Sequence, residues 1–172
     1  MQQSLVEDKI ALIESTTGKP PAENEFINTR ALLIESRFGP VYINPEKAIS
    51  FPHGIPGIEQ FLSFGLTDIP NASNSQFKFL QCLNNYILSF IVIPENHDSQ
   101  LLEESDIDRA CLELGINKHN LLLLFIVTIH ESDSGTKIAI NARAPLFVDT
   151  LNRIASQYVF PNNNYEIQHF IQ

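Results

Sequence analysis

From residue 31 onward, apolar and polar positions fall into short blocks separated by turn residues, a pattern typical of β-sheet proteins. The blocks are rich in the β-branched and aromatic residues that strands favour. The pattern predicts strands at residues 31–38, 41–43, 48–51, 61–66, 77–82, 88–93, 121–129, 137–142, 146–149 and 157–160. Residues 90–93 and 121–129 are almost continuously apolar, so both are expected in central strands with two buried faces. This many strands predict a closed or two-sheet β core.

The predicted core contains large apolar side chains from these central strands. We expect it to include Phe79, Phe90, Val92, Ile126 and Val127. Shortening such a side chain typically costs about 2 to 5 kcal/mol, so loss of binding in a variant of this kind would say little about binding itself.

Helical spacing predicts one short helix inside the β-rich region, at residues 105–114. Ser105 is expected to cap its start, with Asp108 three positions later, and Gly115 is expected to end it. Its apolar residues share one face, so the charged residues opposite, including Asp106 and Glu113, are expected to face water.

The first thirty residues differ from the rest of the chain. Val6, Ile10 and Ile13 fall at helical spacing within residues 4–14, and the segment 15–21, with a glycine and two prolines, would end such a helix. We therefore expect an N-terminal arm over residues 1–30, partly helical or disordered, followed by a mostly β, compact, barrel-like single domain over residues 31–172. Whether the arm is a docked helix or a frayed end stays open at this point.

The loop at residues 51–58 alternates prolines, glycines and bulky apolar residues. Proline restricts φ and glycine permits positive φ, so this spacing predicts one particular tight reversal. Its apolar residues Phe51, Ile55 and Ile58 need apolar partners. The loop should therefore fold back on the core, which is the interpretation we favour, or present an apolar tip to a partner.

Composition fits one soluble domain with an acidic surface. The chain has 172 residues, 44% of them apolar, and a net charge of −9. Residues 95–113 contain seven acids and one base, Arg109, so this segment carries −6 of that charge. Such a field disfavours direct nucleic-acid binding and favours a basic protein partner, although a solvated acidic face kept for solubility would give the same pattern.

Motifs for catalysis, metals and cofactors are absent from the sequence. It has no phosphate-binding loop, nucleophile elbow, dinucleotide fingerprint or zinc-protease helix, and its five histidines lack ligand spacing. Cys82 and Cys111 are expected to be free, buried thiols in a reducing compartment. No apolar run is long enough to span a membrane as a helix, and the N-terminus does not resemble a signal peptide. We expect a cytoplasmic, non-enzymatic protein with no cofactor and no membrane contact.

Several segments carry a family resemblance in a fixed order. They are Ser-Arg-Phe-Gly at 36–39, Phe-Pro-His-Gly-Ile-Pro-Gly at 51–57, Phe-Leu-Gln at 79–81, Phe-Ile-Val-Ile-Pro at 90–94, Ile-Val-Thr-Ile at 126–129 and Asn-Ala-Arg-Ala-Pro-Leu at 141–146. In this order they resemble the flagellar assembly factor W (FliW) family over about residues 34–160. The chain departs from the family pattern at residues 84–86, in its N-terminal arm and in its Asn-rich segment 161–164.

The resemblance implies a function in partner switching. Proteins of this family bind flagellin as a chaperone and bind the carbon storage regulator CsrA, an RNA-binding repressor of flagellin translation, as an antagonist. A small β-barrel enzyme or small-ligand-binding protein is the alternative. The predicted protein-binding residues rest on charge and loop chemistry and are Glu103, Glu104, Asp106, Asp108, Glu113, Ile55 and Pro56. Residues of the recurring segments are expected to serve the fold, namely Arg37, Phe38, Gly39, Phe51, Pro52, Gly54, Gly57, Asn141, Arg143 and Pro145.

Overall fold

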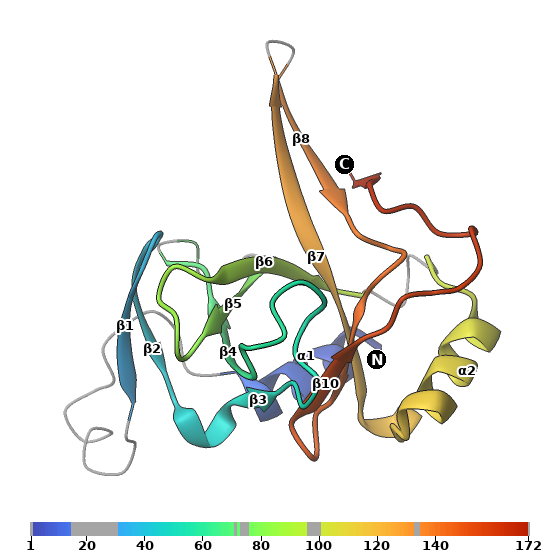
Figure 1. The fold of residues 1–172 in the computed structure, drawn as a ribbon, viewed down its shortest axis with the longest axis horizontal. Coiled ribbons are helices and arrows are strands. Elements are labelled where there is room, and N and C mark those ends of the chain that lie inside the picture. The colour runs from blue at the N-terminus through green and yellow to red at the C-terminus, as the bar shows by residue number, and fades with distance from the viewer. Residues whose placement is uncertain are drawn as a thin grey trace.

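The computed structural model describes residues 2–14, 31–70, 72, 76–95, 101–132 and 135–171, and it shows a β-barrel flanked by two helices (Figure 1). The helices are α1 (Gln2–Ile13) and α2 (Glu104–Leu114), and two short 3-10 turns lie at Pro45–Lys47 and Lys118–Asn120. The strands are β1 (Leu32–Ser36), β2 (Gly39–Ile43), β3 (Ile49–Ser50), β4 (Ser63–Asp68), β5 (Lys78–Cys82), β6 (Ser89–Pro94), β7 (Leu121–Ser132), β8 (Gly135–Ile140), β9 (Leu146–Asp149), β10 (Ile154–Gln157) and β11 (His169–Ile171).

The barrel closes through the long strand β7. The strand order runs β7-β6-β5-β4-β3-β10-β9 and returns to β7, because Leu121–Leu124 of β7 pair with β9. The later part of β7 pairs with β8, and the two strands form a hairpin that projects from the barrel, with β11 at its outer edge (Figure 1). β1 and β2 form a separate hairpin at the opposite end of the molecule from α2. The predicted mostly β, barrel-like fold is confirmed.

The continuous apolar run of β7 is explained by burial on both faces. Leu122 and Leu124 point into the barrel core, whereas Leu121, Leu123 and Phe125 belong to a second core beneath α2. Alternate residues of a strand point to opposite faces, so a strand buried on both sides needs no polar position. The run lies in a central strand, as expected, but burial on both faces ends at Phe125, and Thr128 and Ile129 are exposed where β7 pairs with β8.

Three predicted core residues are only half-buried. Phe79 and Val92 are fully buried, but Phe90, Ile126 and Val127 keep part of their surface exposed and pack against the core from outside. Val127 lies where β7 leaves the barrel and begins to pair with β8, which explains its partial exposure.

The strand predicted at 157–160 is wrong in its position. The actual strand β10 is Ile154–Gln157, and Phe160 is buried without belonging to a strand. Its ring packs against Phe147 and Tyr165, with centroid separations of 6.3 and 4.7 Å. The apolar pattern at 157–160 thus reflects packing between aromatic side chains rather than strand pairing.

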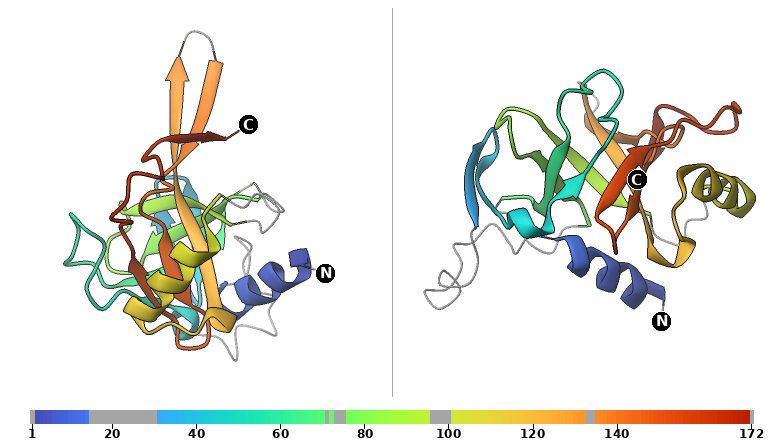
Figure 2. Two further views of the ribbon diagram at one scale, coloured as in Figure 1. Left: turned by 90° about the vertical axis from the view of Figure 1, so that its right-hand side faces the viewer. Right: turned by 60° about the horizontal axis from the view of Figure 1, so that its bottom comes forward.

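The N-terminal helix α1 is docked on the barrel (Figure 2). Ile10 and Ile13 are buried in the barrel core. Lys47 Nζ donates to the carbonyl oxygens of Ala11 and Glu14 at 3.2 and 3.0 Å, which satisfies acceptors at the end of the helix. The predicted helix over 4–14 is therefore present, and residues 15–30 of the arm lie outside the described residues.

The loop at 51–58 folds back on the core, as expected. Phe51 and Ile55 are buried and Ile58 is half-buried, while Pro52 and Pro56 are exposed. Gly54 and Gly57 have φ of +68° and +91°. The loop therefore closes the barrel with its apolar side chains and presents only its prolines and polar residues to water.

The other recurring segments also serve turns. Phe38 packs edge-on against Phe79 at 5.5 Å, and Gly39, at the turn between β1 and β2, has a φ of +113°. Asn141 Oδ1 accepts a hydrogen bond from Ala144 N at 3.0 Å. The backbone N–H of Arg143 donates to Glu166 O and its carbonyl oxygen accepts from Phe160 N, while the expected bracing by its side chain stays a prediction.

Candidate protein-binding site

The acidic helix α2 begins at Glu104, one residue before the predicted range of 105–114. Glu103 is the residue before its first turn, and no side chain caps this end. Ser105 lies inside the first turn, so its predicted capping role is wrong. Gly115 ends the helix in the left-handed conformation with φ of 69°, as predicted.

Asp106 is buried, which corrects the expectation that it faces water. It is 6% exposed and accepts hydrogen bonds from Tyr165 Oη at 2.6 Å and from Asn162 Nδ2 at 3.1 Å. Arg109 forms an ion pair with its other oxygen. The hydrogen bond from Tyr165, more than the other contacts, lowers the pKa of this carboxyl. Asp106 therefore holds the C-terminal segment against α2, and no pattern in the sequence pointed to its partners Tyr165 and Asn162.

The remaining acids of α2 are exposed but mostly engaged. Glu104 and Asp108 both pair with Lys118, and these contacts raise the pKa of the lysine. Glu113 accepts a hydrogen bond from Tyr158 Oη at 2.7 Å. Glu103 forms no ion pair with the residues that the structure describes. The structure thus leaves four of the five predicted acids exposed on or beside α2, and we call these residues together the α2 acidic surface: Glu103, Glu104, Asp108 and Glu113.

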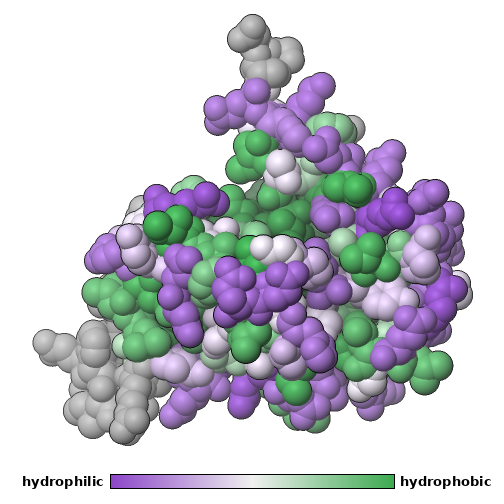
Figure 3. Space-filling model, viewed as in Figure 1, coloured by the Kyte–Doolittle hydropathy of each residue, from purple (hydrophilic) through white to green (hydrophobic). Residues whose placement is uncertain are grey.

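The loop residues predicted to contact a partner lie elsewhere. Ile55 is 4% exposed and belongs to the barrel core, so the expectation that it offers a surface contact is wrong. Pro56 is exposed. Apolar surface on the face in Figure 3 gathers at the base of the β7–β8 hairpin and is otherwise broken up by polar side chains.

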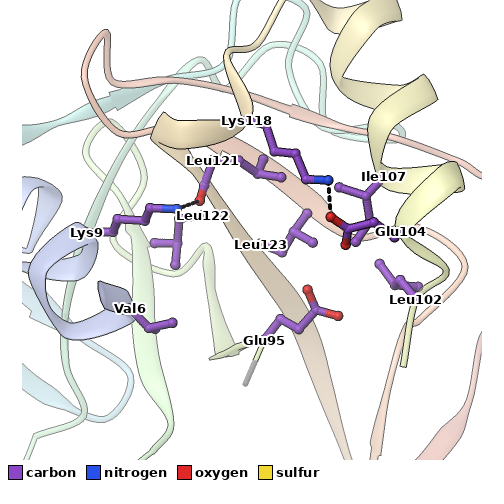
Figure 4. A pocket seen from close by; sticks show the side chains of 10 residues that line it. All are labelled: Val6, Lys9, Glu95, Leu102, Glu104, Ile107, Lys118, Leu121, Leu122 and Leu123. Atoms are coloured by element: carbon purple, nitrogen blue, oxygen red, sulfur yellow. Dashed lines mark hydrogen bonds and ion pairs between the residues drawn. The ribbon is translucent and has the colours of Figure 1, made fainter. Parts of the chain in front are cut away.

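A pocket lies between α1 and α2, over the first residues of β7 (Figure 4). Its volume is about 360 Å³. Apolar walls surround four charged groups, and the lining consists of Val6, Lys9, Glu95, Leu102, Glu104, Ile107, Lys118, Leu121, Leu122 and Leu123.

Glu95 is the unusual group in this pocket. Burial among apolar side chains raises the pKa of its carboxyl to about 7, and the nearby charge of Glu104 adds to this, while a hydrogen bond from the backbone of Leu102 opposes it. The sequence analysis counted Glu95 only as one member of an acidic run. The residues around Glu95 come from α1, α2 and β7, which are far apart in the sequence. No local sequence pattern could therefore predict its environment.

The described part of the chain contains no cluster of metal-binding side chains and no helix that could span a membrane. Within it, no group of three or more His, Cys, Asp or Glu side chains is placed to hold a metal ion. Cys82 and Cys111 are free and buried, as predicted, and burial raises the pKa of the Cys111 thiol. Neither described helix is long and apolar enough to cross a membrane.

Comparison with known proteins identifies the family. The sequence pattern of the FliW protein family matches residues 32–171. The chain belongs to the FliW family. It is 33% identical over 138 residues to the flagellar assembly factor FliW of Desulfitobacterium hafniense strain Y51, covering 79% of this chain and 88% of that protein. It is 30% identical over 145 residues to the FliW of Ruminiclostridium cellulolyticum, covering 81% and 93% of the two chains.

A solved FliW structure has the same fold. A crystal structure of a flagellar assembly factor FliW superposes with a TM-score of 0.64 at 24% sequence identity, and it covers 81% of this chain and 95% of that one. Helix α1 lies before the first residue of the FliW match.

Proposed function

We propose that this chain is a flagellar assembly factor that works by binding two proteins in turn, flagellin as a chaperone and the carbon storage regulator CsrA as an antagonist. Membership of the FliW family carries this proposal, because the curated relatives are flagellar assembly factors. Binding rather than catalysis is the proposed activity.

The α2 acidic surface supports the proposal that CsrA is the second partner. An RNA-binding protein carries basic residues for the phosphate backbone, and an acidic surface complements such residues electrostatically. Glu103, Glu104, Asp108 and Glu113 are exposed on or beside one helix and supply that charge. Asp106 does not belong to the proposed contact surface, because its carboxylate is already satisfied inside the fold.

Competition calorimetry tests the partner switch. The protein is titrated with CsrA from the same organism, then with flagellin, and finally with CsrA after saturation with flagellin. The proposal expects binding to each partner alone and suppressed CsrA binding in the last titration. Binding to flagellin alone would leave a dedicated chaperone, and binding to neither partner would overturn the proposal.

A further inference from the structure

The pocket between α1 and α2 contains a partly buried carboxylate, Glu95, that forms no ion pair with the residues that the structure describes. Figure 4 shows the Glu95 side chain pointing into the pocket, below Leu123 and beside Leu102. Among the described residues, no lysine, arginine or histidine lies within ion-pair distance of its carboxylate. A buried carboxylate normally has a charged partner or several hydrogen bonds, and Glu95 has one backbone donor, Leu102 N.

The two cations that line the same pocket are engaged elsewhere. Lys9 Nζ donates to the carbonyl oxygen of Leu121 at 2.8 Å. Lys118 pairs with Glu104 and Asp108 on α2. Neither group pairs with Glu95, so among the described residues this carboxylate has no ion-pair partner at its end of the pocket.

We propose that this pocket receives a lysine or arginine side chain of a bound protein partner, with the Glu95 carboxylate as its ion-pair partner. This rests on the proposed function in one respect, that the partner is a basic protein. Lysine and arginine bury an aliphatic stem along apolar surface and keep a charged end for a polar group. Leu102, Ile107 and Leu123 offer that apolar surface, and Glu95 offers the polar end.

The pocket's size and surroundings fit this occupant. Its volume of about 360 Å³ lies at the small end of the range for ligand sites, which suits one long side chain better than a cofactor. The exposed acids of α2 border the pocket through Glu104, so a basic partner drawn to that surface would arrive beside it. Val6 and Lys9 come from α1, so part of the pocket lies outside the residues that match the FliW family.

The pH dependence of binding follows from the groups that face Glu95. These are Lys9 from α1, Glu104 from α2 and Lys118 from the 3-10 turn before β7, while the β7 residues in the pocket are leucines. Because a cation binds the ionised carboxylate, affinity should rise as pH increases through the Glu95 pKa of about 7. Between pH 6 and pH 8 the expected gain is about tenfold for one group of this pKa.

Calorimetric titration of CsrA into wild type, E95Q and E35Q at pH 6 and pH 8 tests the proposal. Glu35 is an exposed carboxylate on β1, at the far end of the molecule, and serves as the matched control. The proposal expects wild type and E35Q to bind about tenfold more tightly at pH 8 than at pH 6. It expects E95Q to bind at both pH values at least as weakly as wild type does at pH 6, with no change in affinity between the two.

Two results would overturn the inference in distinguishable ways. If wild type binds CsrA and E95Q matches it in affinity and pH profile, the pocket assignment fails and the proposed function stands. If wild type fails to bind CsrA, the proposed basic partner fails and the pocket assignment fails with it. A carbon-detected NMR titration gives a second readout, since the Glu95 pKa should fall when CsrA is bound and should stay near 7 if the pocket remains empty.

Discussion

Gly54 is held in its conformation by two separate constraints. Its φ of +68° lies in the left-handed region, and an added Cβ would lie 2.4 Å from Glu59 Cα. Gly57, three residues later in the same loop, has φ of +91° but no atom within 4 Å of an added Cβ. Substituting each glycine by alanine therefore distinguishes the cost of a positive φ, present at both positions, from the cost of a steric clash, present only at Gly54.

We predict that G54A destabilises the protein more than G57A does. G57A should cost about 1 kcal/mol, the usual penalty for a non-glycine residue at positive φ. G54A should cost more than about 3 kcal/mol, because the backbone at Glu59 must also move. Urea unfolding of both variants measures the difference, and equal losses of stability would contradict the steric part of this explanation.

Glu95 should lower the stability of the free protein above neutral pH. Its pKa is raised from 4.5 to about 7 on folding, so the folded state binds more protons than the unfolded state between these pH values. Stability from this group is therefore full below pH 4.5 and is lost as pH rises to 7. A shift of this size corresponds to a loss on the order of 3 kcal/mol at pH 8.

E95Q tests this directly, because glutamine cannot ionise. We predict a higher melting temperature than wild type at pH 8 and little difference near pH 4.5. Glu103, which is exposed and whose carboxylate is unpaired among the described residues, provides the control variant E103Q. A lower melting temperature for E95Q at pH 8 would show that Glu95 has a stabilising partner after all.

At the scale of elements, α1 is bound to the barrel through its buried isoleucines. Ile13 is fully buried, whereas its neighbour Leu12 is 54% exposed. I13A should cost about 2 to 5 kcal/mol and L12A less than about 0.5 kcal/mol. Chemical denaturation of the two variants measures this, and equal effects would mean that α1 contributes no core packing in solution.

One hydroxyl group of the C-terminal segment makes two hydrogen bonds at the start of α2. Tyr165 Oη accepts from Glu103 N at 3.0 Å and donates to Asp106 at 2.6 Å. Y165F should cost about 1 to 3 kcal/mol, because it leaves the buried Asp106 with fewer donors. Y158F removes a hydroxyl that contacts the exposed side chains of Glu113 and Arg109, and it should cost less.

The same hydroxyl should affect acid stability. Because the pKa of Asp106 is lowered in the fold, its contribution is present at neutral pH and is lost as pH falls through the folded pKa. The difference in stability between wild type and Y165F, measured by unfolding followed by circular dichroism, should therefore be smaller at low pH than at pH 7. A constant difference at all pH values would contradict the role of Asp106.

The elements that were predicted correctly have strong local patterns. The continuous apolar run of β7, the turn glycines and the end of α2 at Gly115 all depend on residues close in sequence. The failures depend on distant residues. Asp106 is buried because Tyr165 and Asn162, 59 and 56 positions away, reach it, and the three-residue strand β11 exists only through its pairing with β8.

At the scale of the whole molecule, the acidic residues of α2 lie at one end of the barrel. The α2 acidic surface lies opposite the β1–β2 hairpin, and a FliW barrel separates the two (Figure 1). Family membership was predictable from ordered short segments, whereas the pocket was not, because α1, α2 and β7 form it together. Variants at the two ends therefore provide a matched comparison within one protein.

The most direct test of the account is the affinity for CsrA of two double variants, measured by calorimetry at low and moderate salt. E103K+E113K reverses charge on the α2 acidic surface, and E35K+E131K reverses two exposed acids on β1 and the projecting hairpin. The account predicts that wild-type binding weakens with salt, and that only E103K+E113K loses affinity, at an unchanged melting temperature. Equal affinities for the two double variants would contradict a partner bound through α2.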